Sequence, residues 1–309
     1  MAVTGERISL QPSEAFLRRR RLVDRGVRWL LFAAASLSVF VTVAIVYILV
    51  SESVVFFANV SIVEFLTSTS WTPLFTNANY GIWPLLTATM VVAGIALLVA
   101  IPAGTLLAVY LSEYADSRVR EIIKPFLELL EGVPTVVYGY FALLFVTPLL
   151  QTFIPGLSGF NMLAPGLVMG VMILPYVTSV SEDAMRAVPN QLREGAYGLG
   201  FTRWQTARKV VIPGAFSGIT AAYILGMSRA VGETMVVAIA AGQNPKFTLD
   251  PTEGAATITA YIVQVSLGDL PHGSIGYQTI FAAGLTLFVI TLSFNVLGFY
   301  LRRRFREVY

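Results

Sequence analysis

The sequence predicts an all-α, polytopic membrane protein with six transmembrane helices. First, 56% of its 309 residues are hydrophobic and 13% are charged, about half the charged share of an ordinary soluble domain. Second, six apolar runs are long enough to cross a hydrocarbon core, which takes ~20 residues. Third, Lys and Arg gather in alternate connections between these runs, as the positive-inside rule requires. Lipid is therefore the expected solvent.

The six predicted spans lie near Trp29–Val50, Pro84–Tyr110, Pro125–Leu150, Asn161–Ser179, Gly214–Ala241 and Thr279–Leu301. The first run follows a basic segment, as the core of a secretory signal does. However, its 22 residues exceed an ordinary signal core, and no convincing small-residue cleavage site follows. We therefore expect a retained span.

Lys and Arg number seven before the first span, three between the second and third, five between the fourth and fifth, and four after the sixth. The other two are Lys246, in an external connection, and Arg229, inside a span. By the positive-inside rule both termini are cytoplasmic. We expect residues 1–28 to form a cytoplasmic segment, 29–301 a six-span domain and 302–309 a cytoplasmic basic tail. The basic clusters suit anionic membrane lipid, and the net charge of +3 gives no reason to expect nucleic acid.

Composition and motifs exclude several classes of site. The chain has no cysteine, which rules out disulfides, thiolate metal sites and cysteine nucleophiles. Its one histidine, His272, argues against a histidine-based metal centre or catalysis. No GxxxxGK[ST] phosphate loop occurs, so we expect no ATP hydrolysis by this chain. We predict no catalytic residues and no metal site.

Arg229 is the sharpest candidate for a functional residue. In a fifth span that begins near Gly214, it lies about 22 Å along the helix at ~1.5 Å per residue, close to the midplane of the bilayer. A charge there costs at least about 2.5–3.5 kcal/mol and needs a partner or water. Glu233 follows four residues later on the same helical face. The two form either a structural ion pair or an anion site whose guanidinium fork suits a tetrahedral oxyanion.

Acidic residues and a candidate hinge mark the start of the predicted third span. Glu128 and Glu131 lie one helical turn apart, either at a solvated helix end, where acids favour the helix dipole, or against a moving gate. Gly132 and Pro134 follow directly as the candidate hinge. Proline leaves a carbonyl unpaired, which a membrane tolerates only where protein or a water-filled cavity satisfies it.

A polar, basic segment, Glu194–Pro213, separates the fourth and fifth predicted spans. Its sequence, EGAYGLGFTRWQTARKVVIP, predicts a short helix, a turn and a second short helix. That shape suits docking into a groove of another protein.

This segment resembles the EAA loop of ABC importer permeases, whose pattern is Glu-Ala-Ala, three residues, Gly, nine residues and Ile-x-Leu-Pro. The matching positions are Glu194, Gly195, Ala196, Gly200, Val210, Ile212 and Pro213, where Gly195 replaces an alanine, Val210 the isoleucine and Ile212 the leucine. The resemblance implies that Glu194 is a polar contact at the start of a helix and that Gly200 forms the turn. It also implies that the loop couples the chain to a separate ATPase.

Two further segments resemble the PstC-type permease subunits of phosphate ABC importers: Leu130–Gly139, LEGVPTVVYG, and Ser228–Met235, SRAVGETM. The resemblance implies the type I ABC importer permease fold in the bacterial inner membrane. It implies a heterodimer with a PstA-type permease, two ATP-binding subunits and an external phosphate-binding protein. ATP would bind to the partner, so no cofactor is expected in this chain.

Other functions remain open on the residues alone. One arginine fits molybdate, sulfate or phosphonate as well as phosphate, and only the resembling segments favour phosphate. A stand-alone secondary transporter would need inverted repeats and coupling-ion carboxylates near the midplane, and only Glu233 qualifies. A membrane-embedded enzyme would need a nucleophile–base or metal constellation, which the sequence does not offer.

Overall fold

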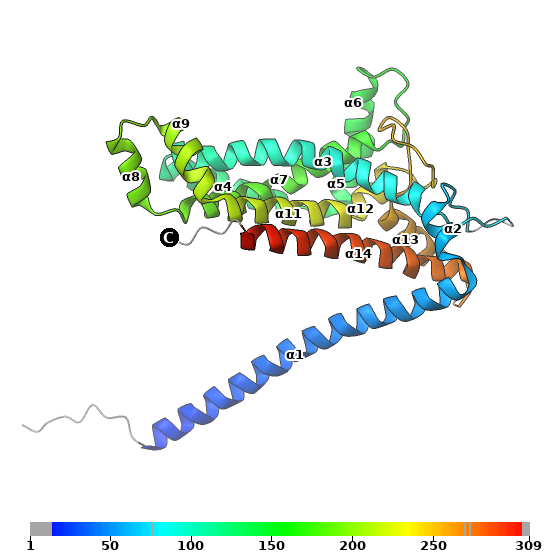
Figure 1. Cartoon of the computed structure of the whole chain (residues 1–309), viewed down its shortest axis with the longest axis horizontal. Coiled ribbons are helices and arrows are strands. Elements are labelled where there is room, and N and C mark those ends of the chain that lie inside the picture. Colours follow the sequence, from blue (N-terminus) through cyan, green and yellow to red (C-terminus); the bar gives the residue numbers. More distant parts are fainter. Residues whose placement is uncertain (1–13, 74, 76, 269, 272, 305–309) are drawn as a thin grey trace, which may run out of the picture. The chain divides into compact units, whose positions relative to one another are not determined.

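The computed structural model describes residues 14–73, 75, 77–268, 270–271 and 273–304, and this part of the chain is helical without a named strand. The all-α prediction is confirmed. His272, residues 1–13 and residues 305–309 of the predicted basic tail lie outside the described residues. The α-helices and the π-helical turns η1–η3 (Figure 1) are α1 Glu14–Asn59, α2 Ile62–Thr67, α3 Trp83–Val109, η1 Tyr110–Tyr114, α4 Ser117–Gly132, α5 Thr135–Phe141, η2 Ala142–Val146, α6 Thr147–Gln151, α7 Leu163–Arg186, α8 Asn190–Gly198, α9 Arg203–Thr206, η3 Ala207–Val211, α10 Ile212–Gly214, α11 Phe216–Gly232, α12 Met235–Ala240, α13 Ile258–Ser266 and α14 Ile275–Arg304.

The chain divides after Ser51 into two compact units. The first contains most of α1, which begins at Glu14 and thus extends 15 residues before the expected start at Trp29. The run Arg18–Arg21 belongs to this helix because arginine is a good helix former. The second unit contains all the elements from α2 onward.

In the described part of the chain, four helices are long and apolar enough to cross a membrane, at residues 16–59, 83–114, 163–186 and 275–301. The number rises to six if two bent helix pairs each count as one span, in agreement with the six-span prediction. In one pair, α4 meets Thr135–Gln151 at 87°, and in the other, Arg203–Gly214 meets α11 at 73°.

Two of the predicted spans are not single straight helices. The run Pro125–Leu150 is not one straight span, because Pro125 lies within the charged helix α4 and the direction changes at Val133 and Pro134. The run Gly214–Ala241 is interrupted after Gly232, where Glu233 is extended with φ −65° and ψ 136°. The first break lies at the candidate hinge, Gly132 and Pro134, whereas the second was not predicted.

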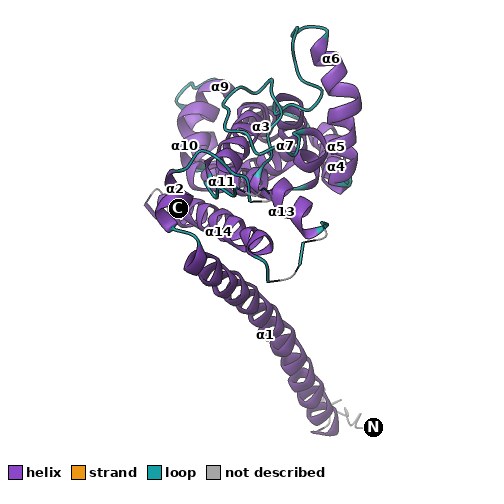
Figure 2. Cartoon of the chain, turned by 90° about the vertical axis from the view of Figure 1, so that its right-hand side faces the viewer, coloured by secondary structure: helices purple, strands orange, loops and turns teal. Residues whose placement is uncertain are grey.

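Helices α3 and α7 form the centre of the second unit, with α11 against α7 and α14 against α11 (Figure 2). Small residues allow α3 and α7 to approach closely. A Cβ on Gly170 would lie 2.6 Å from the Cβ of Val99, and one on Gly104 would lie 2.8 Å from a methyl group of Val177. Such small-residue contacts are the usual basis of helix packing where lipid replaces water.

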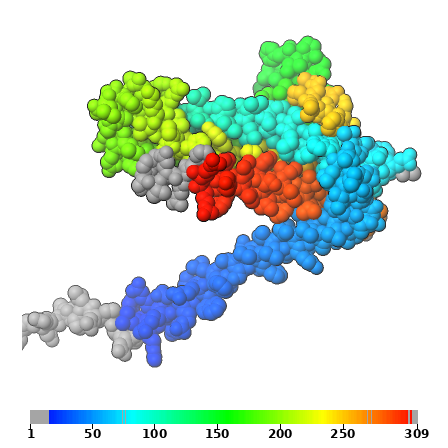
Figure 3. Space-filling model, viewed as in Figure 1, coloured from blue at the N-terminus to red at the C-terminus, as the bar shows by residue number. Residues whose placement is uncertain are grey.

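The connections of the second unit gather at two ends. Helices α4, α8 and α9 and the C-terminal end of α14 lie at one end, and α2, α6 and α13 lie at the other (Figure 1). We call the first the α8–α9 end; it stands out in the space-filling view (Figure 3). Within the second unit, the two basic connections predicted to share one side of the membrane, before α4 and around α8 and α9, therefore lie at the same end.

Candidate functional site

The break between α11 and α12 places Glu233 at the junction of two helices. Its carboxylate Oε1 accepts hydrogen bonds from the backbone N–H groups of Met235, at 3.1 Å, and Val236, at 3.5 Å. Its carbonyl accepts one of 2.7 Å from the Thr259 hydroxyl on α13. These bonds satisfy backbone groups that the break leaves without helical partners. These three bonds at the break therefore hold Glu233 in place.

A second break separates α4 from α5. Val133 and Pro134 are extended, with ψ of 127° and 134°. The Tyr138 hydroxyl on α5 reaches back and donates a hydrogen bond of 2.8 Å to the Leu130 carbonyl on α4. Gly132 and Pro134, the predicted hinge, therefore lie at a real change of direction. Whether the chain moves there stays a prediction.

The two breaks lie side by side because α5 packs against α12. A Cβ on Gly139 of α5 would lie 2.9 Å from the Ile239 Cδ1 and 3.2 Å from the Met235 carbonyl. Gly139 thus permits a close approach that a larger residue would obstruct. The two sequence segments that resemble phosphate permeases, far apart in the chain, meet here.

Arg229 lies in the last turn of α11, beside this junction. Its Nη2 is 3.8 Å from the Glu233 Oε2, and its Cζ is 5.9 Å from the centre of the Tyr176 ring. The Glu131 carboxylate at the end of α4 attracts it electrostatically. Glu233 and Arg229 do contact each other. The prediction that both lie on one continuous helical face was wrong, because Glu233 lies beyond the end of α11.

The exposure of this pair is unequal. The Glu233 side chain is 4% exposed and the Arg229 side chain 43%. A separation of 3.8 Å is too long for a hydrogen bond, and among the described residues the Arg229 guanidinium makes none. Its fork of donors is therefore available to an anion while a carboxylate and an aromatic face hold it in place.

A cavity of about 170 Å³ lies between α4 and α7, and Glu131 is one of its lining residues. Its lining includes the charged side chains of Lys124, Glu128 and Glu131 and the hydroxyls of Thr178 and Ser179. Glu128 and Glu131 are both exposed. The two acids that the sequence placed at a helix start in fact lie in the last turns of α4, next to a polar cavity.

The Glu194–Pro213 segment has the predicted helix–turn–helix form. Helix α8 ends at Gly198, and Gly200 has φ +83°, a conformation that favours glycine. Thr202 and Gln205 then form a reciprocal capping box at the start of α9. The turn predicted at Gly200 is confirmed.

The residues of the EAA-like pattern occupy different surroundings. Ala196 is buried, whereas Glu194 and Gly195 are exposed. The prediction that Glu194 lies at the start of a helix was wrong, because α8 begins four residues earlier at Asn190. Ile212 and Pro213 begin α10, where proline is tolerated because its missing N–H falls in the first turn.

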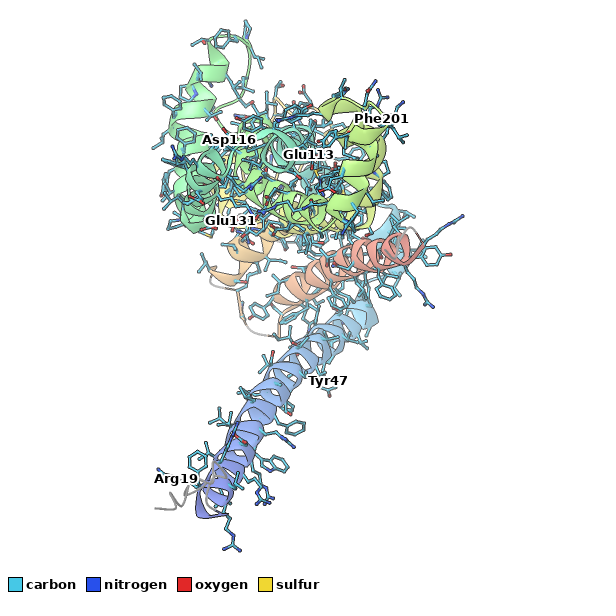
Figure 4. The ribbon with its side chains drawn as sticks, turned by 90° about the vertical axis from the view of Figure 1, so that its left-hand side faces the viewer. Arg19, Tyr47, Glu113, Asp116, Glu131 and Phe201 are labelled. Carbon is cyan, nitrogen blue, oxygen red and sulfur yellow. The ribbon has the colours of Figure 1, made fainter. Side chains whose placement is uncertain are left out.

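Arg193, one residue before the pattern, was missed by sequence reasoning. Its Nη2 lies 3.1 Å from the Glu113 Oε1 and 2.7 Å from the Met185 carbonyl, and its Nη1 lies 2.6 Å from the Val188 carbonyl. It lines a cleft of about 790 Å³ formed by η1, the start of α4, α8 and α9. Glu113, Asp116 and Phe201 from the same cleft are labelled in Figure 4. Arg193 therefore ties α8 to the ends of two spans.

Glu182 was also missed. Its side chain is 0% exposed and lies 2.5 Å from the Lys124 Nζ, 3.4 Å from the Arg120 Nε and 3.5 Å from the Arg186 Nη1. Three cations around one buried carboxylate compensate its loss of hydration. The cluster fastens α4, which carries Arg120 and Lys124, to α7.

The family model described as "Binding-protein-dependent transport system inner membrane component" matches residues 100–307. The chain is 38% identical over 291 residues to the "Probable ABC transporter permease protein YqgH" of Bacillus subtilis (strain 168), covering 93% of this chain and 94% of that protein. It is 34% identical over 263 residues to the "Phosphate transport system permease protein PstC" of Mesorhizobium japonicum, covering 78% of each. The PstC protein of Haemophilus influenzae is 33% identical and covers 76% of this chain and 79% of that protein.

Solved structures show the same fold at low identity. A chain of a bacterial ABC transporter involved in the import of the acidic polysaccharide alginate matches with a TM-score of 0.65 at 17% identity, covering 93% of this chain and 100% of that chain. A chain of the MetNI methionine ABC transporter matches with a TM-score of 0.54 at 18% identity, covering 74% and 95%. The type I ABC importer permease fold expected from the sequence is thereby shown.

Proposed function

The chain belongs to the family of binding-protein-dependent transport system inner membrane components, and from this premise we propose that it is the permease subunit of an ATP-driven phosphate importer. The observation that best supports phosphate as the substrate is the 34% identity, over 78% of the chain, to a phosphate transport system permease. The junction of the two breaks supports it, because there the fold exposes an arginine fork beside two interrupted helices. Interrupted helices at membrane depth are tolerated where they line a polar route.

An inner-membrane permease of this family works with an ATPase and an external binding protein. Our finer proposal is a heterodimer with a PstA-type permease, two ATP-binding subunits and a phosphate-binding protein. ATP binds to the ATPase subunits rather than to this chain. The α8–α9 end faces the cytoplasm, together with both termini, because that end carries the basic connections.

Docking of the ATPase is assigned to α8 and the turn after it. This segment stands at the end of the second unit (Figure 3). It exposes Glu194, Gly195 and Tyr197, and the tip residue Leu199 is 81% exposed. A short helix with an exposed apolar tip suits insertion into a groove. Gly200 keeps the turn tight, so closure of the ATPase pair moves α8 as one piece.

Phosphate crosses beside Arg229 in this proposal. The guanidinium donates two parallel hydrogen bonds to oxygens of the tetrahedral anion, which a lysine could not match in geometry. Glu233 keeps the fork oriented when the site is empty. Since a site that held the anion equally well in every state would trap it, the contact must weaken in one conformation. The adjacent breaks at Glu233 and at Gly132–Pro134 are where the helices can change direction.

The main rival is an importer of another oxyanion. Sulfate, molybdate and phosphonate satisfy the same fork, so the geometry alone does not favour phosphate. The phosphate permeases among the relatives favour it. A stand-alone secondary transporter is disfavoured because the chain belongs to a family of binding-protein-dependent systems.

Uptake of labelled phosphate tests the proposal. The chain and its partners are expressed in cells that lack their own phosphate importer, with excess unlabelled sulfate or molybdate as competitor. We expect uptake that requires ATP and resists both competitors. Loss of uptake under one competitor would transfer the assignment to that anion, and an assembled complex without phosphate uptake would refute it.

A further inference from the structure

One side chain of helix α8, that of Arg193, makes its polar contacts with the ends of the membrane spans. Its packing is mainly against α9 and η3, and the segment that joins it to α7 is only Ala187–Pro189. In the described part of the chain, the side-chain hydrogen bonds that connect α8 to α3, η1 or α7 all come from Arg193. A movement of α8 can reach the spans through the chain that joins it to α7 and α11, through apolar packing, or through Arg193, and of the side-chain hydrogen bonds of α8 only those of Arg193 contact the ends of two spans directly in the described residues.

The bonds of Arg193 fix both position and orientation. Its Nε and Nη2 point to the two carboxylate oxygens of Glu113, at 3.4 Å and 3.1 Å. The same guanidinium donates to the carbonyl of Met185, in the last turn of α7, and to that of Val188, two residues after its end. Ser112 donates a further bond of 2.7 Å to Glu113. One planar group thus joins the ends of α3 and α7 to α8.

Burial makes this connection stiff. The Glu113 side chain is 2% exposed and that of Arg193 is 13% exposed. A planar, bidentate pair shielded from water has few alternative geometries. The surrounding apolar cluster, which includes Val109, Met185 and Val211, holds η3 rather than α8. Apolar contacts are non-directional, so they do not fix the angle of α8 as the guanidinium does.

We propose that the Glu113–Arg193 pair is the joint that transmits the movement of α8 to α3 and α7, so that ATP hydrolysis is coupled to transport. Arg193 and Glu113 are positioning residues in this inference, which rests on the proposed function above. Breaking the pair should leave the exposed docking face of α8 present but free to tilt. ATP would then be hydrolysed with less phosphate moved.

The test compares ATP hydrolysed with phosphate transported, per assembled complex, in sealed vesicles that contain the complete importer and the binding protein. The variants are Glu113→Gln, which removes one charge with little change of shape, and Arg193→Lys, which keeps the charge but loses the fork. Asp116→Asn is the matched control, because it also removes one negative charge and Asp116 is an exposed residue that lines the same cleft. If wild-type vesicles transport phosphate but the variants keep the wild-type ratio, this inference fails alone. If wild-type vesicles transport no phosphate, the proposed function fails.

We expect the ATP-to-phosphate ratio to rise about tenfold in Glu113→Gln, within the usual range of coupling between sites. Arg193→Lys should show a smaller rise, and Asp116→Asn should keep the wild-type ratio. A purely structural pair would instead reduce the amount or thermal stability of the complex and leave the ratio unchanged, which would overturn the inference. Loss of ATPase binding by an otherwise assembled permease pair would also overturn it.

Discussion

Tyr138 and Leu130 lie on opposite sides of the break between α4 and α5, and the Tyr138 hydroxyl donates a hydrogen bond of 2.8 Å to the Leu130 carbonyl. That carbonyl belongs to the last turn of α4, where helical partners are missing. The bond therefore closes the bend across Gly132 and Pro134 with a side chain from the next helix. It links the angle of α4 to the position of α5.

The variant Tyr138→Phe should loosen this bend. A net contribution of about 0.5–1.5 kcal/mol is typical for such a hydrogen bond, so we expect the purified complex to unfold at a temperature a few degrees lower. Thermal unfolding followed by fluorescence measures this. Tyr140→Phe is the matched control, because Tyr140 lies on the same helix and is 54% exposed. An equal shift in both variants would contradict a specific role of the hydroxyl.

The sequence predicted the spans well where a helix is straight. Residues Pro84–Tyr110 and Thr279–Leu301 agree with α3 and α14 to within a few residues, apart from the π-helical turn that extends α3. It placed a candidate hinge at Gly132 and Pro134 but not a bend of 87°, and it missed the break at Glu233, because both runs are apolar enough to read as continuous spans. Their positions depend on contacts between α5 and α12, which lie far apart in the chain.

Buried ion pairs show the same limit. Glu182 lies three residues after the predicted end of the fourth span at Ser179, and the local sequence does not mark it as buried. Its burial depends on Arg120 and Lys124, which α4 brings from another part of the chain. The Glu113–Arg193 pair likewise joins residues 80 positions apart. One usable signal existed: Glu113 is an acid close to a predicted span end and to a basic loop.

The segment between α12 and α13 should lose order in acid. Lys246 donates a hydrogen bond of 2.7 Å to Glu253, and this bond, with a smaller one from Thr248, lowers the pKa of Glu253 below its ordinary value of 4.5. Bonds from the Thr252 hydroxyl and amide lower the pKa of Asp250 similarly. Because the folded-state pKa values are lowered, the stabilisation is present above the ordinary carboxyl pKa and is lost as the pH falls through the lowered values.

Hydrogen exchange of residues 242–257 measures this loss of order. The complex is held in lipid discs at about pH 6 and about pH 3, with rates corrected for intrinsic exchange. We expect protection to fall in the acidic sample. The double variant Asp250→Asn, Glu253→Gln is the control, since it should show little dependence on pH. Equal pH dependence in the wild type and the double variant would assign the effect to other groups.

Arg229→Gln should lower phosphate uptake without loss of assembly. Hydrogen bonds to charged groups contribute about 1.5–3 kcal/mol, so uptake should fall about ten- to a hundredfold. Arg229→Lys should recover only part of the rate, since it keeps the charge but not the fork. The measurement is initial uptake per assembled complex, with Lys246→Gln as a control for the loss of a positive charge. Loss of assembly in Arg229→Gln would favour the structural ion pair.

Glu131→Gln tests how Arg229 releases its anion. Glu131 attracts Arg229 and lies at the end of α4, directly before the break at Gly132–Pro134. A movement of α4 that brings the carboxylate closer would compete with a bound oxyanion for the guanidinium. The neutral variant cannot compete as a charge, so phosphate should stay longer on Arg229. We therefore expect both the maximal rate and the apparent KM for uptake to fall, by roughly three- to tenfold, for a lost competition worth ~1 kcal/mol. Glu121→Gln is the matched control, since Glu121 is an exposed acid on the same helix. A higher KM at an unchanged maximal rate would show that Glu131 helps to capture phosphate rather than release it.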